Sequence, residues 1–246
     1  MGFSMDYFSI VPVDITSEIL TRLPMESVLD CKLVCTNWKS LIRQLSFSKV
    51  HLYRHNHPAG KLAFRNTTDN KEIFYYFECD ENHDEPIQRT KRIKFSSPFS
   101  DTMFVGSCNG LICLLDYDYP SFCICNPITR EYVLLQYFKR DAEEYDHWVG
   151  GFGYLSSTNE YKVVGICKLE SGFVEVYIYT LGSGYGWRNV GNFNFELSQR
   201  RMDHGIFLNG ALYWMDSKLK TILTFDLAKE KFCENLSPPP LKQDNG

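Results

Sequence analysis

Three segments in the second half of the chain repeat one pattern at a nearly regular interval. Each has an apolar strand, a polar turn and an aromatic residue that opens the next strand; they read FCICNPITREYVLL, VYIYTLGSGYGWRNV and TILTFDLAKEKFCEN. The strand ends at Asn126, Thr180 and Asp226 lie 54 and 46 residues apart, an average of 50. A repeat of this length predicts β units that stack and bury their faces against one another.

A second repeat supports the first. The segments CNGLICLL at 108–115 and LNGALYWM at 208–215 each place an Asn-Gly pair before an apolar strand, which is typical of a tight hairpin turn. An interval of 50 residues is that of one four-stranded blade of a kelch-like β-propeller. Three clear units and a weaker one around residues 60–100 predict an all-β, propeller-type domain of about four blades. Both a closed and an incomplete ring agree with this pattern.

Residues between 11 and 47 follow a helical pattern instead. The apolar residues of the first expected helix fall at i, i+4, i+5 and i+8, namely Ile15, Ile19, Leu20 and Leu23. Asp14 or Thr16 is expected to cap the start of this helix, and Pro24 to end it. A second helix is expected over 26–33, and a third with its N-cap at Thr36. Three helices this short bury little surface, so the sequence predicts that a partner completes the unit.

Composition argues against several classes of protein. The formal net charge of −4 disfavours a nucleic-acid binder, and no apolar stretch reaches the roughly 20 residues needed to span a bilayer. The N-terminus lacks the pattern of a signal peptide, and the nine cysteines are odd in number and spread along the chain. The sequence therefore predicts reduced thiols and a cytoplasmic or nuclear location, with no cofactor, metal, nucleic acid or membrane as a partner.

Several polar segments carry other interpretations. Three histidines in HLYRHNH at 51–57 are candidate metal ligands, although such clusters are more often solvated. The basic run RTKRIK at 89–94 is more typical of a solvated strand than of a targeting signal. The acidic segments CDENHDE at 79–85 and DAEEYDHW at 141–148 place carboxylates beside His83 and His147, as a hydrolytic or carbohydrate-binding propeller requires. No nucleophile elbow or phosphate loop accompanies them.

Short phrases in a fixed order identify a family resemblance. Val11-Pro12, Asp14-Ile15, EILTRLP at 18–24 and VCTNW at 34–38 resemble an F-box. GSCNGLICL at 106, NPITREY at 126, GFGY at 151, FLNGALYW at 207 and ILTFDLAKEKF at 222 resemble the F-box-associated interaction domain of plant F-box proteins. The resemblance implies an α+β multidomain chain. The domains implied by this resemblance are a three-helix F-box at 9–47, a linker and first β unit at 48–104, the F-box-associated β domain at 105–236 and a tail at 237–246.

The resemblance also implies a function. In such proteins the F-box docks on a Skp-type adaptor, which links it to a cullin, and the β domain holds the protein that an SCF-type ligase ubiquitinates. The chain itself is then a non-catalytic subunit. Position by position, the residues implied to contact the Skp-type adaptor are Val11, Pro12, Ile15, Ile19, Leu20, Leu23, Pro24, Val28, Leu33, Val34 and Trp38.

Two other functions stay open from the sequence. One is a propeller that uses its acidic loops to bind or hydrolyse carbohydrate, and the other is a scaffold that no longer recruits a ligase. The target protein is not identified by any motif, and recognition is expected in the least patterned loops, 80–90, 139–149 and 198–205.

Overall fold

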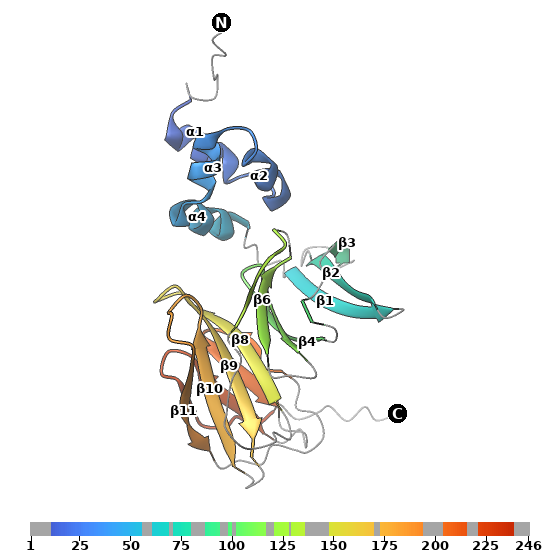
Figure 1. Ribbon diagram of the computed structural model, residues 1–246, viewed down its shortest axis with the longest axis vertical. Coiled ribbons are helices and arrows are strands. Elements are labelled where there is room, and N and C mark those ends of the chain that lie inside the picture. The colour runs from blue at the N-terminus through green and yellow to red at the C-terminus, as the bar shows by residue number, and fades with distance from the viewer. Residues whose placement is uncertain are drawn as a thin grey trace, which may run out of the picture. The chain divides into compact units, whose positions relative to one another are not determined.

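The computed structural model describes residues 11–55, 61–68, 71–79, 87–93, 98–99, 102–116, 121–127, 129–135, 148–169, 173–193, 204–215 and 221–238. The chain divides into two compact units. One contains the helices and most of a three-stranded sheet, and the other contains three four-stranded sheets (Figure 1). The expected class, helices followed by an antiparallel propeller-type β domain, is confirmed.

The described residues form four helices where three were expected: α1 (Val13–Leu20), α2 (Met25–Cys31), α3 (Thr36–Ile42) and α4 (Leu45–His55). The predicted caps were wrong. Pro12 and Pro24 are the N-cap residues of α1 and α2, and neither helix has a side-chain cap. Proline suits the start of a helix because its missing N–H would have no intrahelical partner there. The N-cap of α3 is Cys35 rather than Thr36, and its Sγ accepts a hydrogen bond from the backbone N–H of Trp38.

The helices enclose a small core of their own. Its buried members come from all four helices, and they are Leu20, Val28, Leu41, Ile42 and Phe47. His51 of α4 is also buried; its Nε2 lies 2.9 Å from the backbone carbonyl oxygen of Leu23, and its ring stacks on Phe47. α4 therefore packs against the other helices through Phe47 and His51.

A three-stranded sheet follows the helices in the sequence. Its strands are β1 (Lys61–Thr68), β2 (Lys71–Cys79) and β3 (Ile87–Ile93), in the order β1-β2-β3. β2 and β3 pair antiparallel, with a register shift between Glu78 and Cys79. This sheet corresponds to the weaker unit that the sequence predicts near residues 60–100.

The three remaining sheets have four antiparallel strands each, joined in sequence order. Sheet I contains β4 (Thr102–Cys108), β5 (Leu111–Asp116), β6 (Phe122–Asn126) and β7 (Glu131–Leu134). Sheet II contains β8 (Trp148–Leu155), β9 (Glu160–Lys168), β10 (Val174–Thr180) and β11 (Trp187–Phe193). Sheet III contains β12 (Ile206–Leu208), β13 (Ala211–Met215), β14 (Ile222–Asp226) and β15 (Lys231–Phe232). Each predicted repeat is the third and fourth strand of one sheet.

The two Asn-Gly pairs form the predicted hairpin turns. Asn109 and Gly110 have φ angles of 50° and 79°, and Asn209 and Gly210 have 50° and 81°. Positive φ at both central residues is the geometry of a type I′ turn, which Asn and Gly adopt at low cost. The turns join β4 to β5 and β12 to β13, so they occupy equivalent places in sheets I and III.

Sheets I, II and III are stacked face to face, with one apolar layer between sheets I and II and another between sheets II and III. Val105, Leu115, Phe122 and Ile124 of sheet I pack against Phe152 and Val163 of sheet II. The opposite face of sheet II packs on sheet III, where the buried members include Val164, Ile166, Val176, Leu212, Trp214 and Phe225. Sheet II is thus covered on both faces, as an inner propeller blade is.

Glycines bring β8 close to sheet III. A Cβ on Gly151 would lie 2.7 Å from Leu212 Cδ1 and 2.8 Å from Trp214 Cζ2, so no larger residue fits without movement. Gly205 pairs in parallel with Gly151, and its N–H donates to the carbonyl of Gly150 at 2.8 Å. A Cβ on Gly205 would lie 2.5 Å from Trp214 Cε2, so at both glycines the place of a side chain is taken by the indole ring of Trp214.

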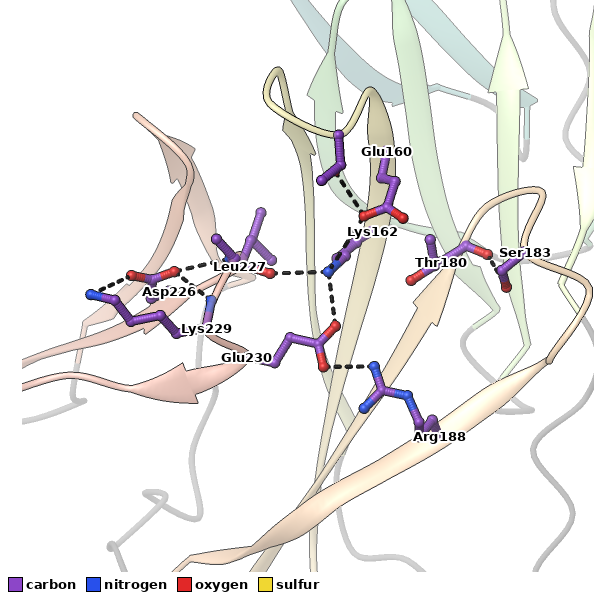
Figure 2. Close-up of polar contacts among 11 residues, drawn as sticks. Glu160, Lys162, Thr180, Ser183, Arg188, Asp226, Leu227, Lys229 and Glu230 are labelled. Atoms are coloured by element: carbon purple, nitrogen blue, oxygen red, sulfur yellow. Dashed lines mark hydrogen bonds and ion pairs between the residues drawn. The ribbon is translucent and has the colours of Figure 1, made fainter.

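A buried cation also joins sheets II and III (Figure 2). Lys162 of β9 is 6% exposed, and its Nζ donates to the carbonyl oxygen of Leu227 at 3.1 Å and to Glu230 Oε1 at 2.8 Å. The other oxygen of Glu230 accepts from Arg188 at 2.6 Å. Burial raises the pKa of Glu230, but the hydrogen bonds from Lys162 and Arg188 outweigh it, so the net pKa lies below its usual value. The β14–β15 turn is therefore held to sheet II by the hydrogen bonds and ion pairs of Lys162 and Arg188 with Glu230.

The central strands of sheet I contain buried thiols. Cys113, Cys123 and Cys125 are each at most 1% exposed, and all three are free cysteines. Burial raises the pKa of Cys123 and Cys125 to about 12, and that of Cys113 well above its ordinary value. These side chains act as small apolar residues of the core.

Candidate functional site

The first helix presents two apolar faces, of which the helical core uses one. Ile15 and Ile19 are each 53% exposed, whereas Leu20, the next residue along, is 1% exposed. Thr16 is buried on the same side as Leu20, because residues four apart share a helix face. Ile15 and Ile19 therefore present branched apolar side chains that the helical core leaves uncovered.

Other residues of the helical unit are exposed in the same way. Over residues 11–34, the exposed apolar set consists of Val11, Pro12, Val13, Ile15, Ile19, Pro24, Leu33 and Val34. Helix α4 exposes three more large apolar residues, Leu45, Val50 and Tyr53, which are not counted in this set. Leu33 is 86% exposed in the turn that follows α2. A unit of four short helices has little surface, so this much uncovered apolar area is typical of an interaction site.

A hollow of about 240 Å³ lies beside the start of α1. It is lined from two sides, by residues at the N-terminal end of α1 and residues along α3: Val11, Val13, Thr16, Asn37, Trp38, Ser40, Leu41 and Gln44. Val11 and Trp38 were predicted contact residues. Val13, Asn37, Ser40 and Gln44 were not, because no apolar period singles out the polar residues and Val13 precedes the predicted stripe.

The structure separates the eleven predicted contact residues into three groups. Seven are exposed, namely Val11, Pro12, Ile15, Ile19, Pro24, Leu33 and Val34. Leu20 and Val28 are 1% exposed and belong to the helical core. Leu23 and Trp38 are half-buried and pack against that core from outside. Only the exposed and half-buried groups have surface available to a partner.

One carboxylate holds two helices together beside the exposed apolar set. Glu18 of α1 accepts hydrogen bonds from Arg54 of α4 and from Arg22. These bonds, the one from Arg54 being the stronger, lower the pKa of Glu18 to about 2. α1 is thereby held to α4 by its polar side, while Ile15 and Ile19 stay uncovered.

The other predicted segments are described only in part. His51 is buried against Leu23, the side chain of His55 is not described, and His57 lies outside the described residues. Residues 80–86 and 141–147, which hold most of the acidic segments, also lie outside them. Among the residues that the structure does describe, no group of three or more His, Cys, Asp and Glu is placed to hold a metal ion. Among the described residues, every helix is too short or too polar to cross a bilayer.

Comparison with known proteins agrees with this arrangement. A small helical module followed by a propeller-type β domain defines the class of the chain. The family described as F-box associated beta propeller domain matches residues 61–241, and the F-box domain family matches residues 8–49. The chain belongs to the F-box-associated β-propeller family and carries an F-box.

Its relatives include F-box proteins of Arabidopsis thaliana. One is 30% identical over 92% of this chain and 58% of its own length, and a second is 26% identical over 93% and 60%. A third, an F-box/kelch-repeat protein, is 27% identical over 93% of this chain and 65% of its own length. The chain therefore spans about three fifths of the length of these relatives.

Proposed function

We propose that this chain is the substrate-recognition subunit of an SCF-type ubiquitin ligase, acting without catalytic chemistry of its own. The F-box docks on a Skp-type adaptor and through it on a cullin, and the β domain binds the protein to be ubiquitinated. The chain thus supplies proximity between ligase and target. Its place of action is the cytoplasm, the nucleus or both.

The observation that carries the proposal is that α1 has two apolar faces, one packed in the helical core and one exposed. Leu20 and Val28 already complete a helical core, so the exposure of Ile15 and Ile19 is not a failure of packing within the unit. An interface core is typically apolar, with charged residues depleted at its centre. Within the described helices, α1 offers such a surface, and Pro12 and Pro24 fix the backbone at the start of α1 and α2.

The test is binding of the full chain to a purified Skp-type adaptor, measured by calorimetry. Ile15→Asp and Ile19→Asp are expected to weaken binding by more than about tenfold, because each places a charge at the centre of an apolar interface. Both residues are exposed, so the helical unit keeps its fold. Tyr53→Asp is the matched control, since Tyr53 is 86% exposed on α4, outside the exposed apolar set.

Three results decide the question. Loss of binding in the two α1 variants with retention in Tyr53→Asp supports the proposal. Equal affinity in all of them shows that α1 is not the docking surface. Absence of binding by the unaltered chain rejects the adaptor function and favours the scaffold alternative.

A further inference from the structure

Helix α1 is too short to be stable by itself. It spans eight residues, and isolated helices of this length are marginal in water. Its N-cap, Pro12, provides no side-chain cap. The last four carbonyl groups of any helix lack an intrahelical partner, so other donors have to satisfy them. The position of Ile15 and Ile19 therefore depends in part on what holds the C-terminal end of α1.

Helix α4 supplies donors at that end. Nε2 of His51 lies 2.9 Å from the carbonyl oxygen of Leu23, and because a carbonyl oxygen only accepts, this nitrogen carries the proton and donates. Nη1 of Arg54 donates to the backbone carbonyl of Glu18 at 3.4 Å, and its Nη2 donates to the carboxylate of the same residue. Cationic side chains and N–H donors are favourable at the C-terminal end of a helix. α4 thus caps α1 from outside.

The contact with Leu23 also affects where α2 begins. The carbonyl oxygen that His51 holds belongs to the peptide bond between Leu23 and Pro24, which we call the α1–α2 corner. Pro24 is the N-cap of α2, and its own carbonyl accepts from the N–H of Val28. Because a peptide bond is planar, fixing this oxygen fixes the direction in which the chain leaves α1 and enters α2.

His51 supports the α1–α2 corner without being exposed itself. Its side chain is 4% exposed and stacks on Phe47 of the helical core, so a partner protein has no access to it. Leu23 is half-buried and Pro24 is exposed, and both are predicted contact residues. His51 can therefore affect a partner only through the residues that it holds.

We propose that His51 and Arg54 of α4 are positioning residues, which hold α1 and the α1–α2 corner in the orientation that a Skp-type adaptor binds. The inference rests on the proposed function, since it concerns the same surface. A surface that is already held in its bound arrangement loses less conformational freedom on association, and so binds more tightly. Both residues lie beyond residue 49, where the match to the F-box domain family ends. The docking unit of this chain thus extends through α4.

Calorimetry of the full chain with a purified Skp-type adaptor tests the inference. His51→Leu removes the donor and is expected to weaken binding by more than about fivefold. His51→Gln places an amide N–H at the same point and is expected to bind as the unaltered chain does. Arg54→Met is expected to weaken binding as well, and Lys49→Met, at an exposed position of the same helix, is its matched control. Hydrogen exchange of the amides in α1–α4 checks that each variant is folded.

Ile42→Val separates positioning from stability. Ile42 is a buried residue of the helical core on α3, so this change lowers the stability of the unit without removing either donor of α4. It is expected to leave the affinity of the folded chain unchanged. Equal weakening by Ile42→Val and His51→Leu would overturn the inference, because any loss of stability would then have the same effect.

Methyl nuclear magnetic resonance of Ile15 and Ile19 in the free chain gives a second readout, which needs no adaptor. Both signals are expected to move in His51→Leu and Arg54→Met and to keep their normal positions in His51→Gln. If His51→Leu does not fold, Arg54→Met decides. Binding by these variants at the affinity of the unaltered chain overturns this inference and leaves the proposed function standing. Absence of binding by the unaltered chain rejects both.

Discussion

At the scale of single residues, two neighbours in the sequence of α1 differ in burial: Ile19 is exposed and Leu20 lies in the helical core. Ile19 and Leu20 are both large aliphatic residues of one helix, but they point to surfaces about 100° apart, the angle that one residue turns in an α-helix. Their apolar character was enough to predict a helix. It was not enough to tell core residues from surface residues. The stripe formed by Ile15, Ile19, Leu20 and Leu23 covers both the face that packs in the helical core and the face that is exposed.

Truncation of these two neighbours is expected to have unequal effects. Leu20→Ala should lower the free energy of unfolding of the helical unit by about 2–5 kcal/mol, because it leaves a cavity among Val28, Leu41 and Ile42. Ile19→Ala should change it by less than about 0.5 kcal/mol, since the side chain is exposed. Hydrogen exchange of the amides in α1–α4 measures both. Equal losses in the two variants would contradict the division of α1 into two faces.

The pKa of Glu18 gives a second prediction at this scale. Its folded pKa of about 2 lies below the ordinary value of 4.5, so its contribution to stability is complete above pH 4.5 and disappears as the pH falls towards 2. Arg54→Met removes the main hydrogen-bond donor, and the pKa should then rise towards 4.5. Nuclear magnetic resonance of the Glu18 carboxyl carbon follows the titration. Lys49→Met is the control on the same helix, and an unchanged pKa in Arg54→Met would show that Arg22 alone determines it.

At the scale of elements, the strands were more predictable than the helices. The Asn-Gly turns and the interval of 50 residues were visible because turn residues and strand alternation are local signals. Helix α4 was missed because few of its residues face the core, and one of these is His51, whose burial depends on the carbonyl of Leu23. A contact with a residue 28 positions away leaves no periodic trace in the sequence of the helix.

The approach of β8 to sheet III leads to a prediction for its glycines. Gly151→Ala should destabilise the β domain by about 1–3 kcal/mol, because the new methyl group overlaps Leu212 and Trp214. Gly106→Ala on β4 is the matched control, since its nearest neighbour would be Phe152 Cβ at an ordinary 3.6 Å. Urea denaturation compares the two. A Gly151→Ala variant as stable as the control would mean that the seam between β8 and sheet III can widen freely.

At the scale of the whole molecule, the chain contains separate hydrophobic cores. The helical core shares no member with the two layers between sheets I, II and III. Cooperative unfolding follows shared packing, so separate cores open with different free energies. The division between a helical unit and a β domain could be predicted from the change of periodicity. The exposure of Met215 could not, because in the sequence it looks like any other buried strand residue.

Separate cores predict two unfolding steps. Leu20→Ala should shift only the step that exposes the helices, and Gly151→Ala only the step that exposes the stacked sheets. Thermal unfolding followed by far-ultraviolet circular dichroism at helix-sensitive and sheet-sensitive wavelengths distinguishes them. If both substitutions displace one common transition, the two units unfold as a single cooperative system.

The buried thiols of sheet I have a practical consequence for kinetic experiments. Only a thiolate reacts readily with an alkylating reagent, and a pKa of about 12 leaves Cys123 and Cys125 almost entirely protonated in the folded chain. Cys233 is exposed and should be labelled at once. Labelling of Cys113, Cys123 and Cys125 therefore has to wait until sheet I opens and exposes these buried side chains. The rate at which the mass of the chain increases through alkylation of these three cysteines then measures the opening rate of sheet I, and no probe has to be introduced.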